Sequence, residues 1–283
     1  MSGWGAELAV YWRNYVPPCR PSRFELSRLS DITKDLRRNT RSRRLRVLIL
    51  GSTTEFRDWA FEERLEAVVV DSSPEFHKEV SKELTHDNVR ESVIFDDWRS
   101  MKFDLEFDLV VGDLVIGNVP KVDLPRLLEN VHNSLLPHGR FVTKSFFARN
   151  DRSAKAIHEV IENLRQFDPC DDPFPELIYE LAMACTDNEK GILSFERMFN
   201  EIERAWQHGQ VTDDQLIRFS EFGWGSKMKF DFLIPTESEW SDEYQRLFEL
   251  DILYRDESTF LSSFPLYVLK PRQDFCITTI ERT

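Results

Sequence analysis

Four short apolar runs recur along the chain and end in similar ways. The first begins at Arg46 and stops at Gly51, and the others span Glu66–Asp71, Ser92–Asp97 and Phe107–Asp113, each closed by an acid. Short runs that are rich in β-branched residues are typical of strands. Because these runs are almost continuously apolar, they indicate a parallel sheet that is covered on both faces.

Helical periodicity fills the gaps between these runs. "SSPEFHKEVSKEL" begins with cap-type serines, carries Pro74 in its first turn and spaces Phe76, Val80 and Leu84 at four-residue intervals. "DLPRLLENVHNSLL" repeats the pattern, and after the turn "PHG" the stretch "RFVTKSFF" is predicted to be a fifth strand. Alternating strands and helices predict an α/β fold with a doubly wound, mostly parallel sheet, whose ligand site lies at the carboxyl ends of the strands.

The pattern changes after this core. Residues 151–229 show helical periodicity without convincing strands, which predicts a helical insertion or lid after the fifth strand. Within residues 230–283, "FELDILYRD" and "FPLYVLKP" are expected to pair as an antiparallel edge of the core sheet. With residues 1–45 as an amino-terminal segment and 46–150 as the core, the sequence favours one elaborated domain over two independent ones.

Composition and charge narrow the possible partners. The 283 residues include 37 Lys or Arg and 50 Asp or Glu, a net charge of -13, which disfavours an extended nucleic-acid-binding surface. The basic run from Lys34 to Arg46 could contact nucleic acid or a phosphorylated acceptor, but a solvated charge cluster before a strand is the commoner explanation and is expected here. Neither a secretory signal nor a run of about 20 apolar residues is present, so a cytoplasmic protein without a membrane span is expected.

Cysteine and histidine spacing provides no signal for a metal site or a nucleophile. The four cysteines lie far apart without a C-x-x-C pair, which indicates reduced thiols. None of the six histidines has metal-ligand spacing, and neither His132 nor His138 has an acid at triad spacing. We expect no metal, and we expect all six histidines to be structural or surface residues.

Three predicted strand ends carry groups that suit a nucleoside. Gly51 would let a ligand approach the backbone at a helix start, although Ser52–Glu55 also fits a capping box that would occupy the same N–H groups. Asp71 follows Gly51 by 20 positions and is placed to accept hydrogen bonds from ribose hydroxyls. Asp97 and Trp98 offer a purine a carboxylate and an indole face.

In order and spacing, Gly51, Asp71 and Asp97 resemble the cofactor-binding residues of the class I S-adenosylmethionine-dependent methyltransferases. In that family these positions meet methionine, ribose and adenine respectively. "FDLVVGDLVIGNVP", "LLPHGRFVTKSFF" and "FPLYVLKP" are similar to the family's fourth strand, the helix, turn and strand that follow it, and its closing strand. The opening motif departs from the usual D-x-G-x-G-x-G, because it reads "ILGSTTE" and lacks the acid and two of the glycines.

The resemblance implies S-adenosylmethionine as the cofactor and an amino-terminal helical segment, residues 1–45, that covers the site; packing of its aromatic residues against the domain is the alternative. Asp113 is the best-placed base if the acceptor must lose a proton, and it is equally suited to bind the sulfonium side or the methionine amine. The expected acceptor-binding residues are Tyr11, Trp12 and Trp224. The expected cofactor-binding residues are Gly51, Ser52, Thr53, Asp71, Ser72, Asp97, Trp98 and Asp113.

The expected function is methyl transfer to a small molecule, which the acidic composition favours among acceptors. Aromatic residues of the insertion are expected either to select the acceptor or to build only the core of the lobe; they are Phe195, Phe199, Trp206 and Trp224. An NAD-type oxidoreductase shares the argument from Asp71 but should show more glycines after the first strand. A non-catalytic S-adenosylmethionine-binding module and a protein or RNA methyltransferase are further alternatives.

Overall fold

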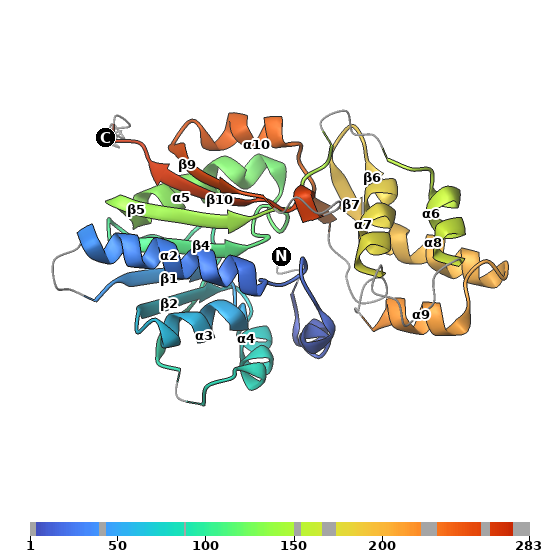
Figure 1. Ribbon diagram of the computed structural model, residues 1–283, viewed down its shortest axis with the longest axis horizontal. Coiled ribbons are helices and arrows are strands. Elements are labelled where there is room, and N and C mark those ends of the chain that lie inside the picture. The colour runs from blue at the N-terminus through green and yellow to red at the C-terminus, as the bar shows by residue number, and fades with distance from the viewer. Residues whose placement is uncertain are drawn as a thin grey trace, which may run out of the picture.

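A computed structural model describes residues 4–39, 44–87, 89–149, 154–165, 174–221, 231–255 and 261–273. These residues form a core sheet with helices on both faces and a smaller lobe beside the core (Figure 1). Within these ranges, no helix combines the length and the apolar content that crossing a membrane requires.

The core sheet has seven strands in the order β3-β2-β1-β4-β5-β10-β9. The strands β1 to β5 pair in parallel, whereas β10 is antiparallel to both of its neighbours. The predicted doubly wound, mostly parallel sheet is confirmed, and β9 and β10 form its antiparallel edge. The bounds are β1 (Arg46–Leu50), β2 (Glu66–Asp71), β3 (Glu91–Phe95), β4 (Phe107–Asp113), β5 (Leu135–Lys144), β9 (Phe248–Tyr254) and β10 (Leu266–Pro271).

One boundary differs from the prediction. The "PHG" segment, expected as a turn, lies inside β5, which already starts at Leu135. The pairing of β5 with β4 shifts register between Phe107 and Leu109, so the segment is accommodated as an irregularity of the ladder.

Successive side chains of each strand serve opposite faces of the sheet. In β1, Val47 and Ile49 join the hydrophobic cluster under α2 (Arg23–Asn39) and α3 (Thr54–Glu62). Leu48 and Leu50 join the cluster under α5 (Leu124–Ser134) and α10 (Glu237–Tyr244). Both faces of the sheet are therefore buried at its central strands, as the continuous apolar runs indicated. The edge strands differ, because Ile94 and Phe95 of β3 are exposed and β9 is mostly uncovered.

The lobe is built mainly from the predicted insertion (Figure 1). Its helices are α6 (Ile157–Arg165), α7 (Phe174–Cys185), α8 (Phe195–Gln207) and α9 (Asp213–Ser220). The expectation of no strands was wrong, because β6 (Thr186–Asp187) and β7 (Ile192–Ser194) form a small antiparallel sheet with β8 (Asp231–Leu233). Strands of two or three residues are too short to show a two-residue periodicity.

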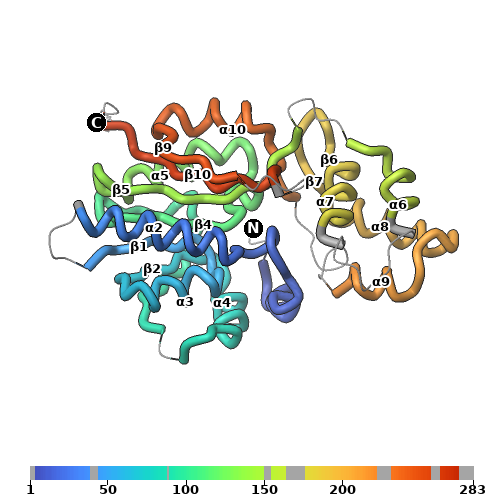
Figure 2. The backbone as a smooth tube through the Cα atoms, in the orientation of Figure 1, coloured from blue at the N-terminus to red at the C-terminus, as the bar shows by residue number. Residues whose placement is uncertain are grey.

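The amino-terminal segment divides into two parts. Its first part, with α1 (Ala6–Ala9) and the 3-10 turn η1 (Trp12–Asn14), packs with α4 (Pro74–Val80) and the lobe in one hydrophobic cluster. Figure 2 shows this dark blue part between the core and the lobe. Helix α2 instead packs on the sheet. The other 3-10 turns are η2 (Ser81–Glu83), η3 (Lys121–Asp123) and η4 (Leu261–Ser263).

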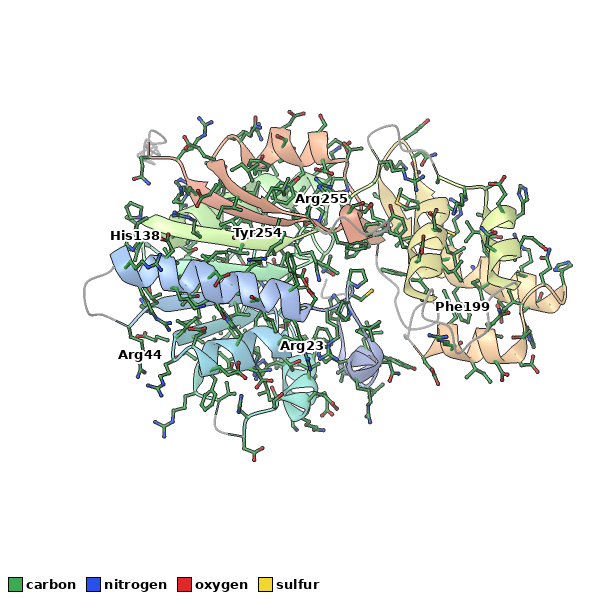
Figure 3. All side chains as sticks on the ribbon, viewed as in Figure 1. Arg23, Arg44, His138, Phe199, Tyr254 and Arg255 are labelled. Atoms are coloured by element: carbon green, nitrogen blue, oxygen red, sulfur yellow. The ribbon has the colours of Figure 1, made fainter. Side chains whose placement is uncertain are left out.

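The described residues of the basic run form the end of α2, up to Asn39, and the entry into β1, which begins at Arg46. Arg37 pairs with Glu63 at 2.7 Å, and Arg46 pairs with two glutamates at 3.0 Å. Figure 3 shows Arg44 and His138 at the end of the core that is remote from the lobe.

Candidate functional site

A cavity of about 1060 Å³ opens at the carboxyl edge of the sheet, between the core, the amino-terminal segment and the lobe. The turns after β1, β2, β3 and β4 all contribute to its wall. Every residue that the sequence assigns to the cofactor lines this one cavity: Gly51, Ser52, Thr53, Asp71, Ser72, Asp97, Trp98 and Asp113.

Of the three residues expected to contact the acceptor, one lines the cavity. Trp12 lines the cavity, and its indole Nε1 donates to Thr54 Oγ1 at 3.0 Å. Tyr11 is partly buried against the neighbouring hydrophobic cluster and does not line the cavity. Trp224 lies outside the described residues.

The turn after β1 has the open backbone that a ligand would need. Gly51 has φ +89°, and an added Cβ there would lie 3.4 Å from the Trp98 ring. The capping box considered for Ser52–Glu55 is not formed, because Thr53 is the N-cap of α3 and no side chain caps the helix. Glu55 pairs with Arg20 instead. The backbone N–H groups in the first turn of α3 therefore have no side-chain cap, and this end of the helix lies at the cavity wall.

Asp71 is anchored by its neighbours. Its Oδ2 accepts from Ser52 Oγ at 2.6 Å and its Oδ1 accepts from the Ser73 backbone N–H at 2.9 Å. A carboxylate has about four acceptor positions, so this buried group can still accept two hydrogen bonds from a ligand in the cavity.

His77 joins this network, which the sequence analysis did not foresee. Its Nδ1 lies 2.9 Å from Ser52 Oγ. Burial lowers the pKa of His77, and the Arg57 guanidinium lowers it further, whereas Glu91 and Asp71 oppose the shift. The imidazole is therefore held neutral and orients the Ser52 hydroxyl beside Asp71.

Asp97 and Trp98, which were expected to contact adenine, are both held by hydrogen bonds within the protein. Arg99 clamps both carboxylate oxygens of Asp97 at 2.5–3.1 Å and reaches Asp123 at 2.8 Å. The side-chain hydrogen bonds from Arg99 are the main reason why the pKa of Asp97 is lowered. The indole Nε1 of Trp98 donates to the Val70 carbonyl at 2.8 Å, which fixes the ring beside Gly51. Asp97 is firmly ionised but already paired.

Asp113 belongs to a buried ionic cluster. Its Oδ1 lies 3.2 Å from Lys144 Nζ, which is also 3.2 Å from Glu25 Oε1 and donates to the Arg20 carbonyl. Burial raises the pKa of Asp113 to about 7; Lys144 opposes the rise and Glu25 adds to it. Burial opposes the charge of Lys144, but the two carboxylates outweigh it and raise the Lys144 pKa. Nearby, burial raises the pKa of the Cys19 thiol to about 12.

The lobe provides the wall opposite the strand ends. Of the aromatic residues considered for acceptor selection, Phe195 lines the cavity. Phe199 packs against Phe219 inside the lobe, with ring centroids 6.4 Å apart, and Trp206 lies on the surface. The lobe aromatics are therefore divided between the cavity wall and the core of the lobe.

Within the described ranges, no group of three or more His, Cys, Asp or Glu side chains comes together in a way that could hold a metal ion. Cys19 and Cys185 are free thiols. Cys170 and Cys276 lie outside the described residues.

No protein-family model matches the sequence, and no match is found among curated proteins. Among solved structures, the CcbJ methyltransferase from Streptomyces caelestis aligns with a TM-score of 0.58 at 12% identity, over 96% of this chain and 98% of its own. A Rhodobacter sphaeroides protein assigned provisionally to the Zn-dependent alcohol dehydrogenases also aligns with a TM-score of 0.58, at 15% identity, over 94% of this chain and 98% of its own.

At these identities the likeness concerns the fold. The strand order separates two versions of that fold, because the standard dinucleotide-binding order 3-2-1-4-5-6 has no reversed strand between its fifth and sixth strands. Here the antiparallel β10 occupies that place. The chain has the Rossmann-like fold of the class I S-adenosylmethionine-dependent methyltransferases.

Proposed function

We propose that the protein transfers a methyl group from S-adenosylmethionine to a small-molecule acceptor. The observation that carries this proposal is that one cavity joins Gly51, Asp71, Trp98 and Asp113, which lie at or just beyond the carboxyl ends of four neighbouring strands. A nucleoside-bearing cofactor fits such a series of strand ends, since each end meets a different part of it. The lobe and the amino-terminal segment enclose the cavity, which suits a small acceptor better than a macromolecule.

The residues present fit the cofactor without the missing glycines. Gly51 permits close backbone approach, and the uncapped start of α3 would bind the methionine carboxylate together with the Thr53 hydroxyl. The Ser52 hydroxyl already donates to Asp71, so Ser52 would contribute by holding that carboxylate in place. Asp71 retains acceptor capacity for the ribose hydroxyls. Trp98 would stack on adenine, whereas Asp97 could accept from the adenine amine only alongside Arg99.

S-adenosylmethionine, when bound, would supply an activated methyl group on a sulfonium sulfur. The chain's own contribution is then positioning and exclusion of water. Asp113 is the proposed base where the acceptor must lose a proton, because a pKa of about 7 suits proton transfer near neutral pH.

An NAD-type oxidoreductase is the second candidate, and the Rhodobacter neighbour keeps it open. Two observations disfavour it: the turn after β1 has a single glycine, and the sheet contains the reversed strand β10. Isothermal titration calorimetry with S-adenosylhomocysteine and with NAD tests the choice. We expect S-adenosylhomocysteine to bind in the micromolar range, about -8 kcal/mol.

Undetectable S-adenosylhomocysteine binding together with micromolar NAD binding would overturn the proposal in favour of the oxidoreductase. Tight S-adenosylhomocysteine binding without methyl transfer to any small-molecule acceptor would identify a non-catalytic module or a methyltransferase that acts on protein or RNA.

A further inference from the structure

The cavity walls away from the strand ends are strongly aromatic. Phe146, at the end of β5, stacks on Phe264 with ring centroids 4.7 Å apart and lies 5.2 Å from the Tyr179 ring of α7. Phe195 and Phe232 add a second pair of rings from the small sheet and α8, 6.0 Å apart. All five rings line the cavity. These walls suit an acceptor with a large apolar body.

The charges on the same lining are unbalanced. Glu7 and Asp231 are exposed at the cavity and form no ion pair within the described residues. The two cations described in the lining are already engaged, Arg99 with two aspartates and Lys121 with Glu239 at 2.9 Å. The lining therefore has free negative charge, whereas its described cations are neutralised.

Asp113 adds an independent observation deeper in the cavity. Its side chain is 5% exposed and lines the cavity, and among the described residues its Oδ1 has no hydrogen-bond partner beyond the ion pair with Lys144. The Lys144 ammonium therefore meets only part of the hydrogen-bonding capacity of this buried carboxylate, and a donor from a ligand would stabilise it further. Lys144, Glu25, Glu55 and the Cys19 thiol lie around Asp113, and because Asp113 also lines the cavity, a ligand bound there can donate to it.

Building on the methyltransferase function proposed above, we propose that the acceptor is an apolar, aromatic-sized amine. Glu7 and Asp231 attract its ammonium group, the rings around the cavity hold its body, and Asp113 receives the nitrogen. Acidic clefts concentrate cations, and aromatic faces attract them further. An anionic acceptor would meet the two free carboxylates, and the cationic side chains described in the lining are already paired.

The chemistry balances with these groups alone. The acceptor ammonium gives one proton to the Asp113 carboxylate and exposes its lone pair. That nitrogen forms a bond to the methyl carbon while the S–C bond breaks and its electron pair passes to sulfur, leaving S-adenosylhomocysteine. The product is the N-methylated ammonium, and Asp113 returns its proton to solvent.

The test uses three probes that share an indole body: tryptamine, tryptophol and indoleacetate. Each is titrated by calorimetry into the full chain saturated with S-adenosylhomocysteine, so no turnover occurs. Tryptamine should bind about tenfold more tightly than tryptophol, on the scale of a cation–π contact with a partly exposed ion pair, and indoleacetate should bind most weakly.

A double variant, Glu7→Gln with Asp231→Asn, should reduce the tryptamine-to-tryptophol preference towards unity while the affinity for tryptophol stays the same. Glu189→Gln is the matched control, because Glu189 is an exposed lobe acid that does not line the cavity. Unchanged affinity for S-adenosylhomocysteine in each variant reports an intact site.

Tryptophol or indoleacetate binding as tightly as tryptamine would overturn the inference, as would a preference that survives in the double variant. These results are separable from failure of the proposed function, which would already appear as absence of S-adenosylhomocysteine binding in the parent protein.

Discussion

Gly51→Ala probes the turn after β1 most directly. Gly51 has φ +89°, where an L side chain costs about 1–2 kcal/mol. Alanine also lowers the conformational entropy of the unfolded chain, which raises the free energy of unfolding by about 0.4–1 kcal/mol. The new Cβ would lie 3.4 Å from Trp98 Cζ2, at the limit of ordinary contact, and the Trp98 ring is held by its hydrogen bond to Val70. A net loss of roughly 1 kcal/mol in unfolding free energy should follow from these terms.

The effect on the ligand should be larger than the effect on stability. The added methyl group would occupy the space between the turn and Trp98, both of which line the cavity. We expect the dissociation constant for S-adenosylhomocysteine to rise by at least about tenfold, or 1.4 kcal/mol, when measured by calorimetry.

Gly209→Ala is the matched control. Gly209 follows His208, the C-cap of α8, and has φ +69°; an added Cβ there meets nothing within 4 Å. It should show a similar backbone cost in urea denaturation but leave ligand binding unchanged. Parent-like binding by folded Gly51→Ala protein would refute the close approach of a ligand to this turn, and equal binding losses in both variants would indicate a global effect.

Three further variants and conditions test the site. Asp71→Ala should weaken S-adenosylhomocysteine binding by about 1.5–3 kcal/mol, the scale of hydrogen bonds to a charged group; parent affinity would contradict the ribose assignment. Lys144→Met should cost about 3–5 kcal/mol in urea denaturation, because two buried carboxylates lose their cation. Lys270→Met removes a partly exposed pair whose Asp251 keeps Arg140 as a partner, and it should cost at most about 1 kcal/mol. Folding lowers the pKa of His77, so its contribution to the free energy of unfolding should be fully present above pH 6.5 and be lost as the pH falls below 6.5. His77→Gln should make the free energy of unfolding depend less on pH in this range.

Local patterns were enough to predict the core. Pro74 in the first helical turn, with Ser73 as its cap, and the apolar runs closed by acids all depend on neighbours within a few residues, and these elements are confirmed. The positions of Gly51 and Asp71 at strand ends follow from the same patterns, since parallel strands end at one edge of the sheet.

Long-range partners could not be predicted in this way. Lys144 meets Glu25 across 119 positions of sequence, and the contact of His77 with Ser52 depends on how α4 packs. The small sheet pairs Ile192 with Leu233, which no local periodicity connects. Arg99 lies two residues from Asp97 in the sequence, but the ion pair between their side chains is evident only in the folded turn.

The place of β10 also constrains how the chain can be synthesised and folded. β5 ends at Lys144, but its second partner begins at Leu266, after the whole lobe and β9. During translation one edge of β5 therefore stays unpaired while the lobe is being made. β9 joins the sheet only through β10, which lies between β5 and β9. An open strand edge invites pairing with other chains, and such distant pairing is slow. The core sheet is thus completed only at the end of synthesis, and until then the open edge of β5 is exposed to aggregation.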